Sequence, residues 1–327
     1  ETVDAILQIP VAATTGLLSR SANAARLNNR GVELEINADV IKKGDFTWTL
    51  SPNWSFNRNR VTDLRGATNI LLNGFAGTSV NPNAVEGYQM GVLFGARTLR
   101  GENGQPTLDA NGFPQLDPTF GVVGDPNPSW RAGFGTTFRF KNLSLFALVD
   151  HVHDFDVWNG TKGTLYVFGT HGDLGKETVV SASDAATIRN SNGQTVAEFG
   201  RPTGDGSFAF RGEIKDFGGG RVALDESWYT NIGGGFNGPN DQFVENINTT
   251  RLREITLSYT LNSPGFRNAT KLQSIDFSVT GRNLYLWTGY TGVDPETNLT
   301  GVSNGRGIDY FNNPGTRSFL FSVKINY

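Results

Sequence analysis

Alternation of apolar and polar residues with a period of two restricts this chain to β-structure. The clearest stretch is DFTWTLSPNWSFN, residues 45–57, in which every second residue from Phe46 to Phe56 is apolar and the residues between them are polar. Successive side chains of a strand point to opposite faces, so this pattern predicts a strand with one apolar face. Further strands are expected at residues 32–40, 131–140, 143–151, 255–261, 275–287 and 319–327.

The connections between these predicted strands alternate between short and long. The short ones span residues 41–44, 141–142 and 262–271, and the long ones span 57–130, 159–250 and 288–316. In an up-and-down antiparallel sheet, alternate connections lie at opposite ends, so all the long loops are expected at one end. Short periplasmic turns and long extracellular loops are the organisation of outer-membrane β-barrels. The sequence therefore predicts an all-β fold in which about seven strands cross a membrane.

The composition is compatible with such strands. No stretch approaches the roughly 18 consecutive apolar residues of a membrane helix, and the mean hydropathy is -0.31. A barrel can be hydrophilic on average because its strands alternate lipid-facing and lumen-facing residues. Seven strands are fewer than the roughly eight of the smallest single-chain bacterial barrels, so we expect them to form part of a larger antiparallel wall. Tyr327 is expected at a membrane interface, where its ring is buried and its hydroxyl is hydrated.

Charge and residue types exclude several classes of function. A net charge of -3 and the lack of any block of Lys or Arg provide no general attraction for nucleic acid. Because the chain has no cysteine, it forms no disulfide, thiolate metal site or cysteine nucleophile. No Ser/His/Asp or paired-carboxylate arrangement stands out, so we predict no catalytic residues and no enzymatic activity.

Four stretches resemble metal or nucleotide sites, but each has a simpler interpretation. DHVHD places His151 and His153 on one strand face, which is too few ligands without a third. Residues 103–118 lack the closing acidic residue of an EF-hand loop, and the glycine triplets at 218–220 and 233–235 lack a GK[ST] element. We therefore predict no cofactor and no metal.

Five stretches form a series that is specific enough to compare with known families. They are RLNNRGVELEINADVIKKGDFTWTLSPNWSFNRNRVTDL, DVWNGTKG, TTRLREITLSYTL, GRNLYLWTGYTGVDPETN and GIDYFNNPGTRSFLFSVKINY. In this order, they resemble the C-terminal portion of the SusC/RagA family of TonB-dependent outer-membrane transporters. The most specific segment is GIDYFNNPGTRS, whereas the stretch from about 171 to 248 carries no family motif.

The resemblance implies a barrel of the large, plugged kind, with roughly 22 strands. It also implies nutrient uptake driven by TonB, and a SusD-like surface lipoprotein that captures glycans or peptides. Residues 1–327 would then be the C-terminal segment of the barrel, and the plug domain and TonB box are absent from this sequence. The implied location is the outer membrane of a Gram-negative bacterium, with the long loops extracellular. The implied partners are the lipoprotein, TonB through the missing N-terminal region, the substrate and membrane lipid.

The strand faces and the loops supply two sets of candidate functional residues. The predicted lipid-facing residues are Phe46, Trp48, Leu50, Ile255, Leu257, Tyr259, Ile275, Phe277, Phe319, Phe321, Val323, Ile325 and Tyr327. The predicted ligand or lid contacts are Trp158, Trp228, Tyr229, Tyr290, Tyr310 and Phe311. Loop aromatics also staple long loops to one another. We further expect the loops to contain hairpins around VLFGARTL and TLYVFG.

Two alternative functions are compatible with the same alternation of apolar and polar residues. A soluble surface glycan-binding β-sandwich would bury Phe46, Trp48, Phe321 and Ile325 against a second sheet. A barrel that acts as a scaffold in a larger envelope complex would share the transporter fold without its uptake activity.

Overall fold

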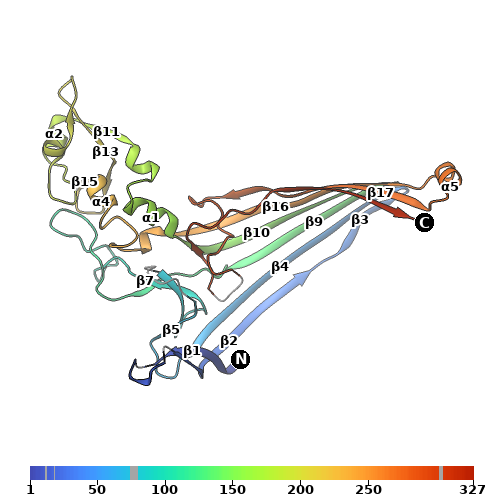
Figure 1. Ribbon diagram of the computed structural model, residues 1–327, viewed down its shortest axis with the longest axis horizontal. Coiled ribbons are helices and arrows are strands. Elements are labelled where there is room, and N and C mark those ends of the chain that lie inside the picture. Colours follow the sequence, from blue (N-terminus) through green and yellow to red (C-terminus); the bar gives the residue numbers. More distant parts are fainter. Residues whose placement is uncertain (12, 18, 74–79, 302–304) are drawn as a thin grey trace.

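One large sheet organises the chain (Figure 1). The computed structural model describes residues 1–11, 13–17, 19–73, 80–301 and 305–327, and ten of the strands in these residues form this sheet. The strands along its path are β1 (Thr2–Pro10), β2 (Ser19–Glu35), β4 (Phe46–Asp63), β9 (Trp130–Phe140), β10 (Leu143–Asn159), β16 (Val244–Leu261), β17 (Ser274–Thr288) and β19 (Ser318–Asn326). Each pairs with its neighbours in antiparallel fashion. The predicted antiparallel all-β fold is confirmed.

Two short strands complete the sheet. β3 (Ala38–Lys43) pairs with β4, and β18 (Ile308–Asp309) pairs with β10 in parallel. The strand predicted at 32–40 is interrupted at Ile36 and Asn37, so that β2 and β3 pair in turn with β4. β1 and the N-terminal half of β2 were not predicted. β1 does carry an apolar face of Val3, Ala5, Leu7 and Ile9, whereas the N-terminal half of β2 has no continuous apolar face.

Short and long connections gather at opposite ends of the sheet (Figure 1). At one end lie a tight turn at Lys141, a turn at Gly44, and the short helix α5 (Pro264–Thr270). Both Lys141 and Gly44 have positive φ angles, as tight hairpins require. The long connections, now 64–129, 160–243 and 289–317, lie at the other end. The expected asymmetry is present, while the side of the membrane that each end faces stays a prediction.

The long loops contain secondary structure of their own. The first holds the small sheet of β5 (Asn69–Leu71), β6 (Val80–Val85), β7 (Val92–Gly95) and β8 (Gly121–Gly124). The second holds α1 (Gly160–Val167), η2 (Gly172–Gly175), β11 (Glu177–Val180), α2 (Ala182–Ala185), α3 (Val196–Phe199), β12 (Arg201–Pro202), β13 (Phe208–Arg211), β14 (Glu213–Asp216), β15 (Arg221–Leu224), α4 (Glu226–Tyr229) and η3 (Asp241–Phe243). A single turn, η1 (Ala13–Thr15), lies between β1 and β2.

One predicted loop hairpin is present and the other is wrong. The segment VLFG forms β7, which pairs with β6 and β8. In contrast, TLYVFG lies mostly in helix α1, where the Asn159 side chain accepts a hydrogen bond from the Lys162 amide and caps the first turn. Tyr166 of this helix packs edge-on against Tyr229 and Phe243, so a tertiary aromatic cluster stabilises the helix.

The buried core lies among the loops rather than against the strand faces. Its largest cluster joins all three long loops and includes Phe113, Tyr229 and Ile308. A second cluster, around Val61 and Ile70, packs the loop ends of β2 and β4 against the first long loop. A third, around Ile188 and Phe210, lies wholly within the second loop. Among the described residues, the helices are all too short or too polar to cross a membrane.

Candidate functional site

The strands near the short turns present one continuous apolar face. Leu145 of β10 lies opposite Leu257 of β16, which lies opposite Val279 of β17, and Val279 lies opposite Phe321 of β19. Parallel rows of apolar side chains flank this one, because the registers continue without a shift over this part of the sheet. All of these side chains are substantially exposed, and Phe321 retains 80% of its accessible surface.

The predicted lipid-facing residues within the strands share this face. The registers connect Phe46, Trp48 and Leu50 of β4, through β9 and β10, with Tyr259, Leu257 and Ile255 of β16, respectively. These three residues of β16 lie opposite Phe277, Val279 and Gly281 of β17. On β19, Val323, Phe321 and Phe319 lie opposite the same three residues of β17, and Ile325 lies opposite Ile275. Tyr327 follows β19 at the short-turn end and is almost fully exposed. Contact of this face with lipid stays a prediction.

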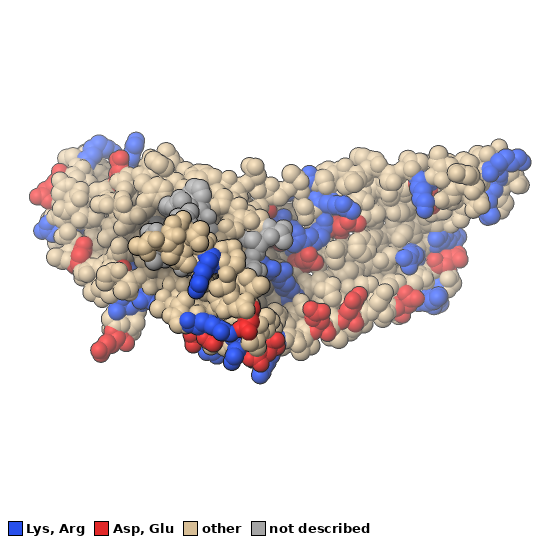
Figure 2. Space-filling model, turned by 60° about the horizontal axis from the view of Figure 1, so that its bottom comes forward, with Lys and Arg blue, Asp and Glu red and all other residues tan. Residues whose placement is uncertain are grey.

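The opposite face of the same strands is polar and bonded across strands. Thr256 and Thr280 join their hydroxyls at 2.8 Å, and the Thr260 hydroxyl donates to Asp276 at 2.7 Å. Asn326 donates to the other oxygen of Asp276 at 3.1 Å. Such cross-strand polar pairs suit a water-filled lumen, as expected for the interior of a barrel. Figure 2 shows charged side chains gathered in the middle of the view, between the loop half and the strand half.

The segments that carry the family resemblance meet where the loops join the sheet. Arg251 of β16 is buried, and its Nη2 donates to Asp294 Oδ1 at 2.7 Å. Its Nε lies 3.0 Å from Glu296 Oε2, an ion pair that leaves the Nε–H without a hydrogen bond. Arg253 holds Glu296 through two hydrogen bonds of 2.8 Å and also donates to Asp150 at 2.7 Å. These pairs fasten the third long loop to β16 and β10.

A second set of contacts fastens the same loop to helix α1. Asp309 accepts hydrogen bonds from the Tyr290 hydroxyl at 2.6 Å and from the Thr161 hydroxyl at 3.0 Å. Burial, together with the hydrogen bond to Asp309, raises the pKa of Tyr290, so its phenol stays protonated and donates. The amide of Gly315 donates to Asp294 at 3.2 Å. The whole arrangement is a structural junction built from charged and polar side chains.

The loop aromatics predicted as ligand contacts are mostly packed inside the loops. Trp158, Trp228 and Tyr229 are buried in the largest cluster, and Tyr310 stacks on Trp158 with 6.3 Å between ring centroids. Tyr290 is buried in a separate cluster, whereas Phe311 is exposed. Trp158 also donates through Nε1 to Asn240 Oδ1 at 3.1 Å. These contacts staple the loops to one another, and ligand or lid contact by these six residues stays a prediction.

The stretches that resembled metal or nucleotide sites take structural roles. His153 stacks on both Trp130 and His151, and His151 Nδ1 lies 2.8 Å from the Thr250 hydroxyl. The carboxylate of Asp109 accepts from the amides of Asn111 and Phe113 at 2.9 Å, which closes a turn. Over the described residues, no group of three or more His, Asp or Glu side chains is arranged to hold a metal ion.

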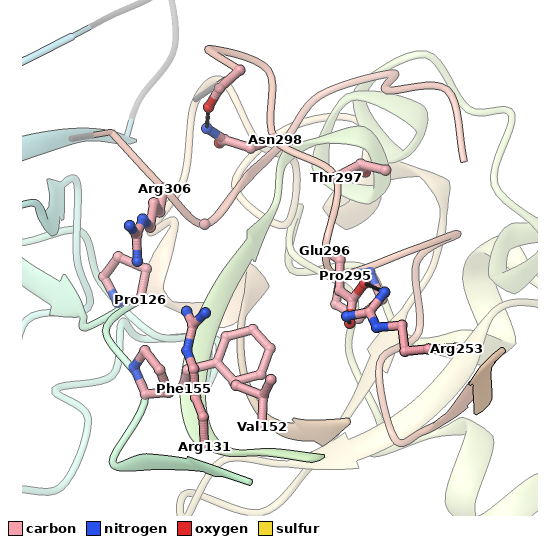
Figure 3. A pocket seen from close by; sticks show the side chains of 13 residues that line it. Pro126, Arg131, Val152, Phe155, Arg253, Pro295, Glu296, Thr297, Asn298 and Arg306 are labelled. Carbon is pink, nitrogen blue, oxygen red and sulfur yellow. Dashed lines mark hydrogen bonds and ion pairs between the residues drawn. The ribbon is translucent and has the colours of Figure 1, made fainter. Parts of the chain in front are cut away.

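A cavity of about 340 Å³ lies beside the junction (Figure 3). Its apolar walls are Pro126, Pro128, Val152, Phe155 and Pro295, and its charged lining is Arg131, Arg253, Glu296 and Arg306. The sequence analysis missed this site because its residues come from two loops and three strands that are far apart in the sequence. Arg131 was visible only as one charge on the polar face of a predicted strand.

Known proteins match the chain along its whole length. The TonB-dependent receptor P3 of Formosa agariphila is 25% identical over 100% of this chain and 31% of its own length. The TonB-dependent receptor SusC of Bacteroides thetaiotaomicron is 25% identical over 98% of this chain and 28% of its own length. The chain thus spans about a third of the length of the curated relatives that it matches. No protein-family model matches.

Solved structures agree on the fold. The RagAB peptide transporter aligns with 99% of this chain and 32% of its own chain, with a TM-score of 0.60 and 16% sequence identity. The antiparallel sheet therefore corresponds to part of the barrel of a TonB-dependent outer-membrane receptor. In sequence, the chain is similar to a portion of TonB-dependent receptors, among them SusC.

The sandwich alternative does not fit this fold. It requires a second sheet over Phe321 and Ile325, but these side chains retain 80% and 54% of their accessible surface. Within the described residues, the large sheet runs from β1 to β19 without closing on itself or stacking on another sheet there.

Proposed function

We propose that residues 1–327 form the C-terminal wall of the barrel of an outer-membrane importer. The importer takes up glycans or peptides, is coupled to TonB through its N-terminal region, and works with a SusD-like surface lipoprotein at the loop end. Its plug domain and TonB box lie outside this sequence. The observation that carries the proposal is the exposed apolar face of the strands.

Hydrophobic burial explains why this face favours a membrane. Contiguous exposed apolar patches on soluble monomers rarely exceed a few hundred Å², whereas this face runs over six neighbouring strands from β4 to β19. In lipid, every backbone N–H and C=O must be paired, which strands achieve only in a closed barrel. The free edges of β1 and β19 therefore call for further strands, in agreement with the greater length of the relatives.

The loop end supports a partner or lid on that side. The second long loop folds around a hydrophobic core of its own, which makes it a firm platform rather than a flexible tether. The solved relatives include the RagAB peptide importer in an open-open state and in a closed-closed state. An importer that opens and closes needs a firm surface at its mouth, and this loop supplies one.

A depth measurement tests the membrane assignment. The chain has no cysteine, so Phe321→Cys and Ser322→Cys each introduce one labelling site here, on opposite faces of β19. Each variant of the full-length protein is labelled with an environment-sensitive fluorophore and reconstituted with lipids that carry bromine on their tails. We expect strong quenching at position 321 and little at position 322. Equal quenching at both positions would contradict the assignment.

A separate experiment tests the coupling. Uptake by cells that produce the full-length receptor is compared with uptake by cells that lack TonB, using labelled oligosaccharide and oligopeptide pools. We expect accumulation only when TonB and the lipoprotein are both present. Accumulation that is unchanged without TonB would favour passive diffusion, or a scaffold role for the barrel.

A further inference from the structure

The cavity beside the junction is lined by two arginine side chains that are not part of the junction. Arg131 extends from the loop end of β9, and Arg306 lies in the third long loop. Neither side chain makes a hydrogen bond or an ion pair with any residue that the structure describes. Figure 3 shows the two guanidinium groups on the same side of the cavity, away from the Arg253 and Glu296 pair.

The neighbouring arginines have a different charge environment. Arg251 is neutralised by Asp294, and Arg253 is held by Asp150 and Glu296. The one acidic side chain in the cavity lining, Glu296, is thereby already engaged by arginine. Arg131 and Arg306 thus line the same cavity without a direct ion pair to any described residue, while Glu296 and Asp150 act on Arg131 only through longer-range electrostatics.

The walls make this charge effective. Three prolines, Val152 and Phe155 give the cavity a mainly apolar lining. Apolar walls lower the local dielectric constant and strengthen the attraction of an anion to a guanidinium group. A planar guanidinium also matches the two oxygens of a carboxylate, which it binds through paired hydrogen bonds.

Two smaller cavities share lining residues with this one. Arg306 also lines cavities of about 130 Å³ and 170 Å³, and Arg131 lines the first of these. Asn57, Asn59 and Asn127 line both. The Asn127 amide donates to Met90 and Asp125 and the Asn59 oxygen accepts from the Met90 amide, so Asn57 and the Asn59 amide nitrogen are the polar groups left to meet a chain. The three cavities together offer a track for an oligomer, with the two arginines at its centre.

We propose that Arg131 and Arg306 form a carboxylate-binding subsite for the transported substrate. This inference rests on the proposed import function and adds a substrate class to it: an oligomer that bears acidic groups. The carboxylate comes either from a uronic acid of a glycan or from an acidic residue of a peptide, since both present the same two oxygens. The apolar walls would hold the adjacent sugar face or aliphatic side chain.

Direct binding to the full-length receptor tests this proposal. The probes are oligogalacturonate and its methyl ester, and an acidic pentapeptide and its amide counterpart, each measured by calorimetry in detergent. The variants are Arg131→Gln and Arg306→Gln. Arg139→Gln is the matched control, because Arg139 lies on the same strand and the same face near the short-turn end. Heat-modifiable migration on gels checks that each variant is folded.

We expect the wild-type receptor to prefer one acidic probe over its neutral counterpart, and the preferred probe identifies the source of the carboxylate. Arg131→Gln and Arg306→Gln should each weaken that probe roughly tenfold or more, as expected for the loss of a charged partner at a binding site. Arg139→Gln should bind like the wild type. The proposal is overturned if neither acidic probe is preferred, or if both cavity variants bind like the control. The proposed import function is tested separately: if it is wrong, uptake by the cells does not depend on TonB.

Discussion

Removing Asp294 should loosen the third long loop from the barrel wall. The Asp294→Ala change takes away the partner of Arg251 Nη2 at 2.7 Å and the acceptor of the Gly315 amide at 3.2 Å. The Arg251 side chain is only 6% exposed and that of Asp294 only 7%. The change therefore leaves a buried guanidinium with Glu296 as its remaining ion-pair partner, and that pairing gives its Nε–H no hydrogen bond.

The free-energy cost of the Asp294→Ala change follows from the burial of both side chains. Breaking a buried pair by removing one partner typically costs about 3–5 kcal/mol, which corresponds to roughly a hundredfold to several thousandfold more frequent opening of the loop. The matched control is Glu254→Gln, because Glu254 pairs with Arg282 at 3.0 Å but the Arg282 side chain is 54% exposed. An exposed pair of this kind contributes at most about 1 kcal/mol.

Hydrogen exchange of the Leu299 amide measures the effect. This amide donates to the Ile308 carbonyl at 3.0 Å, within the loop but without involving Asp294. We expect much faster exchange in Asp294→Ala than in Glu254→Gln. The double variant Arg251→Met with Asp294→Leu should recover much of the protection, because it leaves no unpaired buried charge. Equal protection in Asp294→Ala and Glu254→Gln would refute the argument.

Three further predictions concern the strand face, the loop core and pH. Phe321→Lys should reduce the amount of heat-modifiable receptor in the outer membrane, since Lys near the bilayer midplane costs about 2–4 kcal/mol. Ser322→Lys is the control, because Ser322 lies on the opposite face of the strand. Equal levels of the two variants would contradict a lipid-facing Phe321. Asn240→Ala should make the second long loop sensitive to protease, because it removes the hydrogen-bond partner of Trp158 Nε1 and of the Gly238 carbonyl, at roughly 1–3 kcal/mol per group. Unchanged cleavage would count against this. Burial lowers the pKa of His171 more than the nearby Asp173 carboxylate raises it. The unfolded loop therefore binds more protons than the folded loop below about pH 6.5, and the stability of the loop falls as the pH drops through that range. His171→Asn should abolish this pH dependence of protease cleavage, and an unchanged dependence would show that another group causes it.

The sequence predicts the strands whose apolar alternation is long and clear, and it misses β1 and the N-terminal half of β2. Residues 45–57 alternate without exception and form β4 over their full length apart from Asp45. The N-terminal half of β2, by contrast, reads SRSANAARLNN and is mostly polar on both faces, although it pairs with β1 in an antiparallel ladder with two register shifts. Period-two alternation records the contact of one face with an apolar environment. A strand that extends beyond the apolar zone therefore loses the signal while keeping its hydrogen bonds.

The cavity could not be predicted for a different reason. Arg131 and Arg306 are far apart in the sequence, and they come together only because the third long loop folds back over the loop end of β9 and β10. That fold depends on the pairs between Arg251 and Asp294 and between Tyr290 and Asp309. Each of these residues lies in a segment that carries the family resemblance, yet the sequence alone does not show which of them pair.

The loop end therefore has two parts with different roles: the junction fastens the third long loop, and the cavity presents Arg131 and Arg306. The recognisable segments supply Asp294, Glu296 and Asp309, all of which are occupied in fastening the loop and have little capacity left for a ligand. The groups left free, Arg131 and Arg306, are held over one cavity by that framework. A binding group loses less entropy on capture when its scaffold is already fixed. On this reasoning, weakening the junction through Asp294 should also weaken the binding of an acidic probe, although Asp294 does not line the cavity.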